Sequence, residues 1–299
     1  MSAITKNQSS SNVANELAWA AFKRRAGAFS FHFFVLLFGT AMIYPLLWMI
    51  SASFMTEAEI FGNLNFFPEN PTLANYINGL RGVSGYSFLH FFGNSFLLAF
   101  VNIVGNLISC SLAAFAFAKL KFKGSAIMFS VMMLTMMLPM HVRFIPMYIV
   151  FLRLGWIDTF YPLMVPSFFA VSGFNIFLLV QYMRSISNEL LEAPRIDGCN
   201  TFQIYLHFML PLSIPGLITI AIFTFIAVWN DFFGQMIYLI APARFTVALA
   251  LRMFVDATGQ SAWGSLFAMS VLSLIPLFVV FIAFQRYLLE GIQSGGLKG

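Results

Sequence analysis

Charged residues are scarce in this chain of 299 residues: Asp, Glu, Lys and Arg together make up 9% of it. Hydrophobic residues make up 60%, including 38 Phe and 17 Met, and the mean hydropathy is +0.85. A soluble domain normally has about 45–50% apolar residues and about 25% charged ones. The composition therefore excludes an ordinary soluble protein and indicates a chain whose solvent is lipid.

Reactive side chains are scarce as well. The two cysteines are Cys110, within an apolar run, and Cys199, in a polar connector, so a disulfide between them is not expected. No metal-ligand spacing, paired carboxylates or nucleophile–base pair stands out. A nucleotide-binding loop requires Gly-x-x-x-x-Gly-Lys-Ser/Thr, whereas the similar stretch 291–296 is followed by Leu297. The sequence predicts no catalytic residue, metal ligand or cofactor site in this chain.

Long uncharged runs are abundant instead. A helix needs about 20 apolar residues to cross the hydrocarbon layer, and the runs are continuously apolar rather than alternating as barrel strands are. We therefore expect an all-α membrane protein with six transmembrane helices, at 31–50, 91–118, 124–142, 159–183, 209–230 and 257–285. The polar residues 1–29 precede a run of full span length, which predicts a retained anchor rather than a cleaved signal peptide.

The basic residues predict the orientation of these spans. Of the 16 Lys and Arg residues, 11 lie before span one, between spans two and three, between spans four and five, or after span six. Because cytoplasmic loops carry the excess of Lys and Arg, both termini are expected in the cytoplasm. The expected organisation is a cytoplasmic segment 1–29, a six-span domain 30–288 with a cytoplasmic loop 184–214, and a tail 289–299. The basic pI indicates topology and contact with anionic lipid, not nucleic-acid binding.

The densest charge cluster lies in that cytoplasmic loop, at residues 189–198. Ser187 can cap a short helix that begins near Glu189, and Gly198 can supply the left-handed backbone that ends it. Asn200 and Gln203 form a capping-box pair for a second helix. Composition alone leaves two readings: a solvated connector, or a helical knuckle presented to a soluble partner.

The sequence of this loop resembles a known motif. Asn188-Glu-Leu-Leu-Glu-Ala-Pro-Arg-Ile-Asp-Gly-Cys-Asn200, followed by Leu210-Pro-Leu-Ser-Ile-Pro215, is similar to the EAA loop of binding-protein-dependent ABC importers. The similarity is greatest to the second permease subunit of the maltose-type carbohydrate branch. Supporting segments extend over nearly the whole chain, among them Pro71-Thr-Leu-Ala-Asn-Tyr76, Leu138-Pro-Met-His-Val-Arg-Phe-Ile-Pro146, Trp229-Asn-Asp-Phe232 and the C-terminal stretch from Phe284.

The resemblance implies a type I ABC importer permease fold in the bacterial cytoplasmic (inner) membrane. It implies that the loop is the coupling helix for a cytoplasmic ATPase, with contacts from Glu189, Glu192, Ala193, Arg195, Asp197 and Gly198. A second homologous permease, an ATPase pair that binds ATP and Mg, and an extracytoplasmic solute-binding protein are the implied partners. The family usually has alanine where Pro194 and Cys199 stand, so we expect Pro194 to kink or shorten the first helix.

Polar residues within the spans are candidates for the solute pathway. One face of span two carries Ser95, Asn102, Asn106 and Ser109, and span four carries Ser172 and Asn175. Such residues either hold helices together or line a cavity, and helix–helix contact is favoured for the span-two face. Asp231 at the end of span five is expected to have a structural role at an outer gate, with Arg244 or Arg252 as possible partners. His141 and Arg143 could guide an anionic or hydroxyl-rich solute or extend to the membrane interface.

These observations favour a transport subunit rather than an enzyme. The expected function is import of a sugar or oligosaccharide, neutral or anionic, by alternating access. Alternatives are a permease for another solute such as a polyol phosphate and an ion-coupled secondary transporter. The latter would need buried carboxylates near the membrane midplane, whereas Asp231 lies near a span end. A membrane enzyme has no supporting residue pattern.

Overall fold

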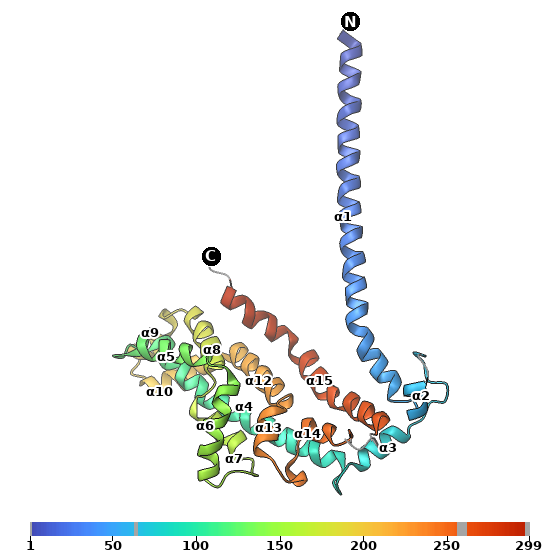
Figure 1. Ribbon diagram of the computed structural model, residues 1–299. Coiled ribbons are helices and arrows are strands. Elements are labelled where there is room, and N and C mark those ends of the chain that lie inside the picture. Colours follow the sequence, from blue (N-terminus) through green and yellow to red (C-terminus); the bar gives the residue numbers. More distant parts are fainter. Residues whose placement is uncertain (1, 63–64, 256–261, 297–299) are drawn as a thin grey trace. The chain divides into compact units, whose positions relative to one another are not determined.

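The computed structural model describes residues 2–62, 65–255 and 262–296, and these residues are almost entirely helical (Figure 1). Within this described part no strand forms, and the one isolated bridge joins Val83 and Tyr86. The expectation of an all-α protein is confirmed. The chain divides into two compact units, residues 1–71 and 72–299.

The first unit consists mainly of one long helix. Helix α1 (Ser2–Ala52) contains the expected first span and continues it on the N-terminal side, and its portion Gly27–Ala52 is long and apolar enough to cross a membrane. After α1 the chain turns into the short helix α2 (Glu57–Gly62). The Ser51 hydroxyl donates a hydrogen bond to the Phe66 carbonyl, which ties the following loop to the end of α1.

The second unit is a helical bundle connected by short turns. Its elements are α3 (Ala74–Arg81), α4 (Phe88–Lys119), α5 (Ser125–Met136), α6 (Met140–Arg153), α7 (Tyr161–Met164), the 3₁₀ helix η1 (Val165–Phe169), α8 (Gly173–Ser185), α9 (Glu189–Ile196), α10 (Thr201–Ile204), the π-helix η2 (Tyr205–Met209), α11 (Leu210–Leu212), α12 (Ile214–Trp229), α13 (Phe233–Tyr238), the 3₁₀ helix η3 (Pro242–Arg244), α14 (Val247–Arg252) and α15 (Trp263–Gly296).

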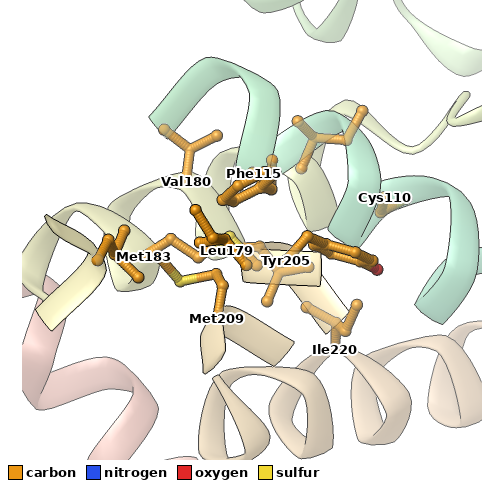
Figure 2. Packing of buried hydrophobic residues seen from close by; sticks show 12 residues of the cluster. Cys110, Phe115, Leu179, Val180, Met183, Tyr205, Met209 and Ile220 are labelled. Atoms are coloured by element: carbon orange, nitrogen blue, oxygen red, sulfur yellow. The ribbon is translucent and has the colours of Figure 1, made fainter. Parts of the chain in front are cut away.

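Helix α4 is the centre of this bundle and packs most extensively against α8 and α12. Two apolar clusters hold it. The first combines side chains of α4, α8 and α12 with Leu191 of α9, Ile204 of α10, and Tyr205 and Met209 of η2 (Figure 2). The second joins the N-terminal part of α4 to α12, α14 and α15 around Trp229, whose indole N–H donates to the Ser273 carbonyl at 3.1 Å.

Span three does not follow the expected straight course. Instead of one helix over 124–142, α5 ends at Met136 and α6 begins at Met140, with an angle of 101° between them. Pro139 stands at the junction as the N-cap residue of α6. A proline disfavours helical backbone at the residue before it and has no N–H to donate, so the break falls at Leu138-Pro139.

Span four is also interrupted, although the sequence predicted one helix over 159–183. The chain runs through α7 and η1, which contain Pro162 and Pro166, and Ala170 then adopts φ +53°, in the left-handed region. Helix α8 starts anew at Gly173. Left-handed backbone cannot continue a right-handed helix, so this span consists of two helical pieces.

Spans five and six differ less from the expectation. A bend of 75° at Ser213 separates the Thr201–Leu212 helix from α12, so span five begins after the bend rather than at residue 209. Helix α15 contains the sixth span, and residues 257–261 of the expected range lie outside the described residues. Among the described residues, four helices are long and apolar enough to cross a membrane, and six spans result when each bent pair counts as one.

Candidate functional site

A helical knuckle, residues 188–212, connects α8 to α12. The Glu189 backbone N–H donates to Ser187 Oγ at 3.2 Å, and Asn188 rather than Ser187 is the N-cap residue of α9. The expected capping box is confirmed: Asn200 Oδ1 accepts from the Gln203 N–H and Gln203 Oε1 accepts from the Asn200 N–H, each at 2.9 Å. Gly198 ends α9 with φ +88°, as expected of a glycine terminator.

Pro194 does not shorten α9, so the expected shortening is wrong. The helix continues through Pro194 and Arg195 to Ile196. Pro194 is the sixth of eight residues, and its missing N–H removes only the bond that would reach the Leu190 carbonyl. Its side chain is buried in the described structure, on the same side of α9 as Leu191, and this packing offsets the lost hydrogen bond.

The two sides of α9 have different environments. On the inner side Leu191 is only 3% exposed and belongs to the first apolar cluster. On the outer side Leu190 is 54% and Ile196 is 85% exposed, and the Glu189, Ala193 and Asp197 side chains lie outside the cavity described next. Apolar residues exposed beside acidic ones form a surface suited to a protein partner.

A cavity of about 390 Å³ lies between α9 and the end of α4. Glu192 and Arg195 line it, together with Asn188, Lys119 and Lys121. Lys119 Nζ donates to the Ile186 carbonyl at 2.6 Å and to Asn188 Oδ1 at 2.8 Å, which fixes α4 to the start of the knuckle. The six predicted coupling residues therefore do not share one face: Glu192 and Arg195 line this cavity, whereas the others lie outside its lining.

The polar face of span two makes contacts between helices. Ser95 Oγ accepts from the Val247 N–H at 2.9 Å. Asn102 Nδ2 donates to the Leu163 carbonyl at 2.9 Å, and Ser109 Oγ donates to the Ser167 carbonyl at 2.7 Å. These three residues join α4 to α14 and to the α7–η1 segment, and they are buried.

Asn106 and the two polar residues of span four line a separate cavity of about 440 Å³. Ser172 and Asn175 reach it from the start of α8, and Thr224 from α12. Asn175 Nδ2 donates to Thr224 Oγ1 at 3.2 Å. Three of the six pathway candidates therefore meet at one cavity, next to the interruption of span four.

Asp231 lines a neighbouring cavity of about 350 Å³ with Asn102 and Gln235. Its Oδ1 accepts from the Gly234 N–H at 2.9 Å, and a Cβ at Gly234 would displace the carboxylate from its present position. The expected partner Arg244 pairs with Asp158 instead.

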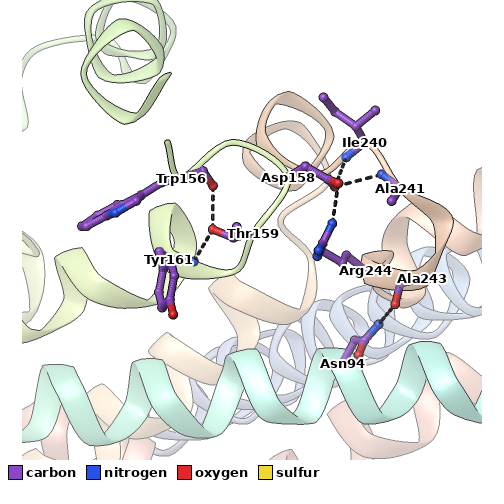
Figure 3. Close-up of polar contacts among 9 residues, drawn as sticks. All are labelled: Asn94, Trp156, Asp158, Thr159, Tyr161, Ile240, Ala241, Ala243 and Arg244. Carbon is purple, nitrogen blue, oxygen red and sulfur yellow. Dashed lines mark hydrogen bonds and ion pairs between the residues drawn. The ribbon is translucent and has the colours of Figure 1, made fainter. Parts of the chain in front are cut away.

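That ion pair is part of an exterior joint that the sequence did not reveal (Figure 3). Asp158, with φ +58°, accepts from the backbone N–H groups of Ile240 at 3.0 Å and Ala241 at 2.9 Å, and from the Arg244 guanidinium. Asn94 on α4 donates to the carbonyls of Ala243 at 3.1 Å and Phe245 at 2.8 Å. The joint therefore links the α6–α7 turn, the α13–α14 connection and the start of α4.

Comparison with known proteins identifies the family. A family model described as "Binding-protein-dependent transport system inner membrane component" matches residues 105–293, more than half of the chain. The chain belongs to this family. The expected resemblance and the membrane localisation are thereby confirmed, and the knuckle lies within the matched region.

Relatives cover nearly the whole permease. The "Putative ABC transporter permease protein ORF2" of Caldicellulosiruptor sp. (strain Rt8B.4) is 34% identical over 85% of this chain and 91% of its own length. The "Arabinooligosaccharides transport system permease protein AraQ" of Halalkalibacterium halodurans is 32% identical over 86% of this chain and 91% of that protein. A chain of a bacterial ABC transporter involved in the import of the acidic polysaccharide alginate superimposes with a TM-score of 0.78, at 25% identity, over 88% of this permease and 96% of that chain.

Among the described residues, no group of three or more His, Cys, Asp or Glu side chains is placed to hold a metal ion. Both cysteines are free, Cys110 buried and Cys199 partly exposed. The candidate sites in the described part of the permease are thus the surface of the knuckle, the cavity between α9 and the end of α4, and the two cavities along α4 and α12.

The exterior joint generates a prediction for Asp158→Asn. Burial acts to raise the pKa of Asp158, but the bonds from Ala241, Ile240 and Arg244 outweigh it and lower the pKa. The ionised carboxylate therefore stabilises the fold above its ordinary pKa of about 3.9, and this contribution is lost as the pH falls through the lowered folded value. We expect Asp158→Asn to lose about 0.5–1 kcal/mol at neutral pH, the scale of an exposed ion pair.

Thermal unfolding of the permease in detergent measures this difference, with Glu57→Gln in the first unit as the matched control. The melting temperature of Asp158→Asn should lie below that of the wild type at neutral pH, and the difference should narrow in strong acid. A difference in melting temperature that widens on acidification, or no difference at neutral pH, would contradict the stabilising role assigned to Asp158.

Proposed function

We propose that this permease is one membrane subunit of an ATP-driven importer that moves a sugar or oligosaccharide into the cytoplasm by alternating access. Support comes from two similar proteins: one is named as a permease for arabinooligosaccharides, and the other is a chain in the crystal structure of an alginate importer. These names include both a neutral and an acidic carbohydrate, so they leave the charge of the solute open. A non-sugar solute such as a polyol phosphate is the alternative.

The proposal includes the assembly in which the permease acts. A second homologous permease subunit supplies the other half of the pathway, a cytoplasmic ATPase pair binds ATP and Mg, and an extracytoplasmic solute-binding protein delivers the solute. Both termini and the knuckle are on the cytoplasmic side, in agreement with the 11 of 16 basic residues on that side. The lipid bilayer surrounds the spans, and no nucleic acid takes part.

The observation that carries this proposal is the two-sided environment of α9. Its outer residues Leu190 and Ile196 are exposed for an ATPase groove, while its inner residue Leu191 is packed into the cluster that joins α4, α8 and α12. Since interiors are close-packed and transmit displacement rather than absorbing it, movement of the ATPase surface displaces these three helices together.

The polar contacts at the knuckle strengthen this connection. The hydroxyl groups of Ser111 on α4 and Tyr205 on η2 lie 2.7 Å apart, within hydrogen-bond distance. Lys119 ties the end of α4 to Ile186 and Asn188, at the entrance to α9. The start of the knuckle and its second half are thus bonded to the same central helix. Displacement of α9 therefore acts first on α4, which lines both cavities.

Co-purification tests the assembly directly. Affinity-tagged permease expressed in its native host should bring down a cytoplasmic ATPase and a second six-span subunit, both identified by mass spectrometry. Uptake of sugar by reconstituted vesicles should require ATP on the side of the membrane where the ATPase is bound. Uptake that survives ATP depletion but collapses with the ion gradient would instead establish a secondary transporter.

The end of α9 gives a sharper test of coupling. Within the described structure a Cβ on Gly198 would meet no atom within 4 Å, so a substitution there acts through its φ of +88° and not through a collision. A β-branched residue in this conformation costs about 1–3 kcal/mol, whereas asparagine tolerates it better. We expect Gly198→Val to reduce uptake per ATP hydrolysed severalfold and Gly198→Asn to reduce it much less.

Reconstituted vesicles allow uptake and ATP hydrolysis to be measured on the same sample. Equal coupling in the Val and Asn variants would show that the left-handed turn does not matter. Normal transport by Gly198→Val would remove the coupling role from this residue.

A further inference from the structure

The two cavities along α4 and α12 adjoin each other, and together we call them the polar groove, after the Asn, Ser and Asp side chains in their lining. The cavity of about 440 Å³ and the cavity of about 350 Å³ share two lining residues of α12, Ala227 and Val228. On α4 they are lined by Asn106 and Asn102, which are four residues apart and therefore on the same face. Each volume is in the range of about 300–1,000 Å³ that small-molecule sites occupy.

Asn102 and Asn106 line this groove with amides whose nitrogens are already bonded. Asn102 Nδ2 donates to the carbonyls of Leu98 and Leu163, both at 2.9 Å, and Asn106 Nδ2 donates to the Asn102 carbonyl at 3.0 Å. Because each amide nitrogen faces a carbonyl oxygen, the orientation of the amide is fixed and its Oδ1 faces away. Asn102 Oδ1 accepts no bond from the described residues, and Asn106 Oδ1 accepts only the weak Cys110 thiol donor at 3.4 Å.

Asp231 adds a carboxylate at one end of the groove. Its Oδ1 is bonded to Gly234, and its Oδ2 accepts no bond from any described side chain. The exterior cations near it in sequence are engaged elsewhere: Arg244 with Asp158, and Arg252 Nη1 with Met236 Sδ at 3.1 Å. No Lys, Arg or His of the described residues lines either cavity, and Arg143, which the sequence suggested as a guide for an anion, is exposed outside them.

Donors and apolar faces complete the lining. Ser172 lines the groove at the N-cap position of α8, and its hydroxyl can donate there. The rings of Phe174 and Phe223 meet edge-on, with centroids 5.6 Å apart, and both residues line the groove. A polyol satisfies such a surface because each hydroxyl both donates and accepts. A carboxylate or phosphate group only accepts, and beside Asp231 it would meet a second anion.

From this lining we infer that the groove passes an uncharged, hydroxyl-rich solute, and that Asp231 is the residue that rejects anionic sugars such as uronates and sugar phosphates. The inference rests on the proposed function for the role of the groove as a solute path. It decides between the neutral and acidic solutes that the relatives leave open.

The charge preference of the groove can be measured with thiol reagents of one size and different charge. Ala227→Cys places a thiol on the wall shared by both cavities, four residues from Asp231. The substitution is made in a Cys199→Ser protein, and Cys199→Ser alone is the control. Neutral, anionic (sulfonate) and cationic (trimethylammonium) methanethiosulfonates are applied to the full complex in native membranes at about pH 8. The rate at which each reagent modifies the introduced thiol is divided by its rate with a small thiol in solution, which corrects for the intrinsic reactivity of the reagent.

The anionic reagent should react about tenfold more slowly than the neutral one. This factor lies between those expected for the repulsion of two unit charges a few ångströms apart in water and in the lower dielectric of a protein. Asp231→Asn should abolish this difference while leaving the rate of the neutral reagent unchanged, because an Asn oxygen can still accept from Gly234. Asp158→Asn, which removes another exterior carboxylate, should leave the difference intact.

Three results would overturn the inference: equal rates for neutral and anionic reagents in the Ala227→Cys protein, a difference that persists when Asp231→Asn is added, or no reaction of the introduced thiol with any reagent. None of these measurements depends on ATP hydrolysis, so they can fail while ATP-driven uptake stands. Conversely, absence of ATP-driven uptake would remove the proposed function without changing the measured charge preference.

Discussion

The burial of the knuckle against α4, α8 and α12 is the constraint on which the rest of the permease depends. Leu191, Ile204, Tyr205 and Met209 come from the knuckle, yet they share one close-packed cluster with Leu179, Ile220 and other residues of the long apolar helices. A loop tethered only at its two ends could move without moving the spans. A loop whose inner residues are part of the bundle core cannot, because opening a void there costs free energy.

Interrupted helices position the polar groove on the other part of the same bundle. Met140 follows the break between α5 and α6, Ser172 follows the break before α8, and Asp231 follows the end of α12. All three residues line one of the two cavities. Non-helical backbone at membrane depth is tolerated where it is buried in protein or lines a cavity. The breaks therefore bring chain ends and polar side chains to these cavities.

Local chemistry made part of this structure predictable from the sequence. The Asn200–Gln203 capping box and the left-handed Gly198 depend on residues within a few positions of one another, and both were expected. Apolar run length indicated the spans, but it could not reveal the bend at Pro139, since a proline is compatible with either a kink or a complete break. Pro194 shows the converse, because tertiary burial preserved a helix that the local rule would end.

Contacts between distant segments were beyond sequence reasoning. Asp158 and Arg244 are 86 positions apart, and nothing in either segment indicates that they pair. The same holds for the pathway residues: one polar face on span two includes both Ser95 and Ser109, which join helices, and Asn106, which lines a cavity. Helical spacing gave them one face, but only the packing of α7, α8 and α14 distinguishes their surroundings.

The most direct test of the coupling account compares two neighbouring leucines of α9 in reconstituted vesicles. Leu191→Ala weakens the packing of the knuckle on the bundle and leaves its outer surface intact, while Leu190→Ala alters the exposed surface. The account predicts that Leu191→Ala still binds the ATPase and hydrolyses ATP but loses much of its uptake per ATP, whereas Leu190→Ala loses ATPase binding. Unchanged uptake per ATP in Leu191→Ala would contradict it.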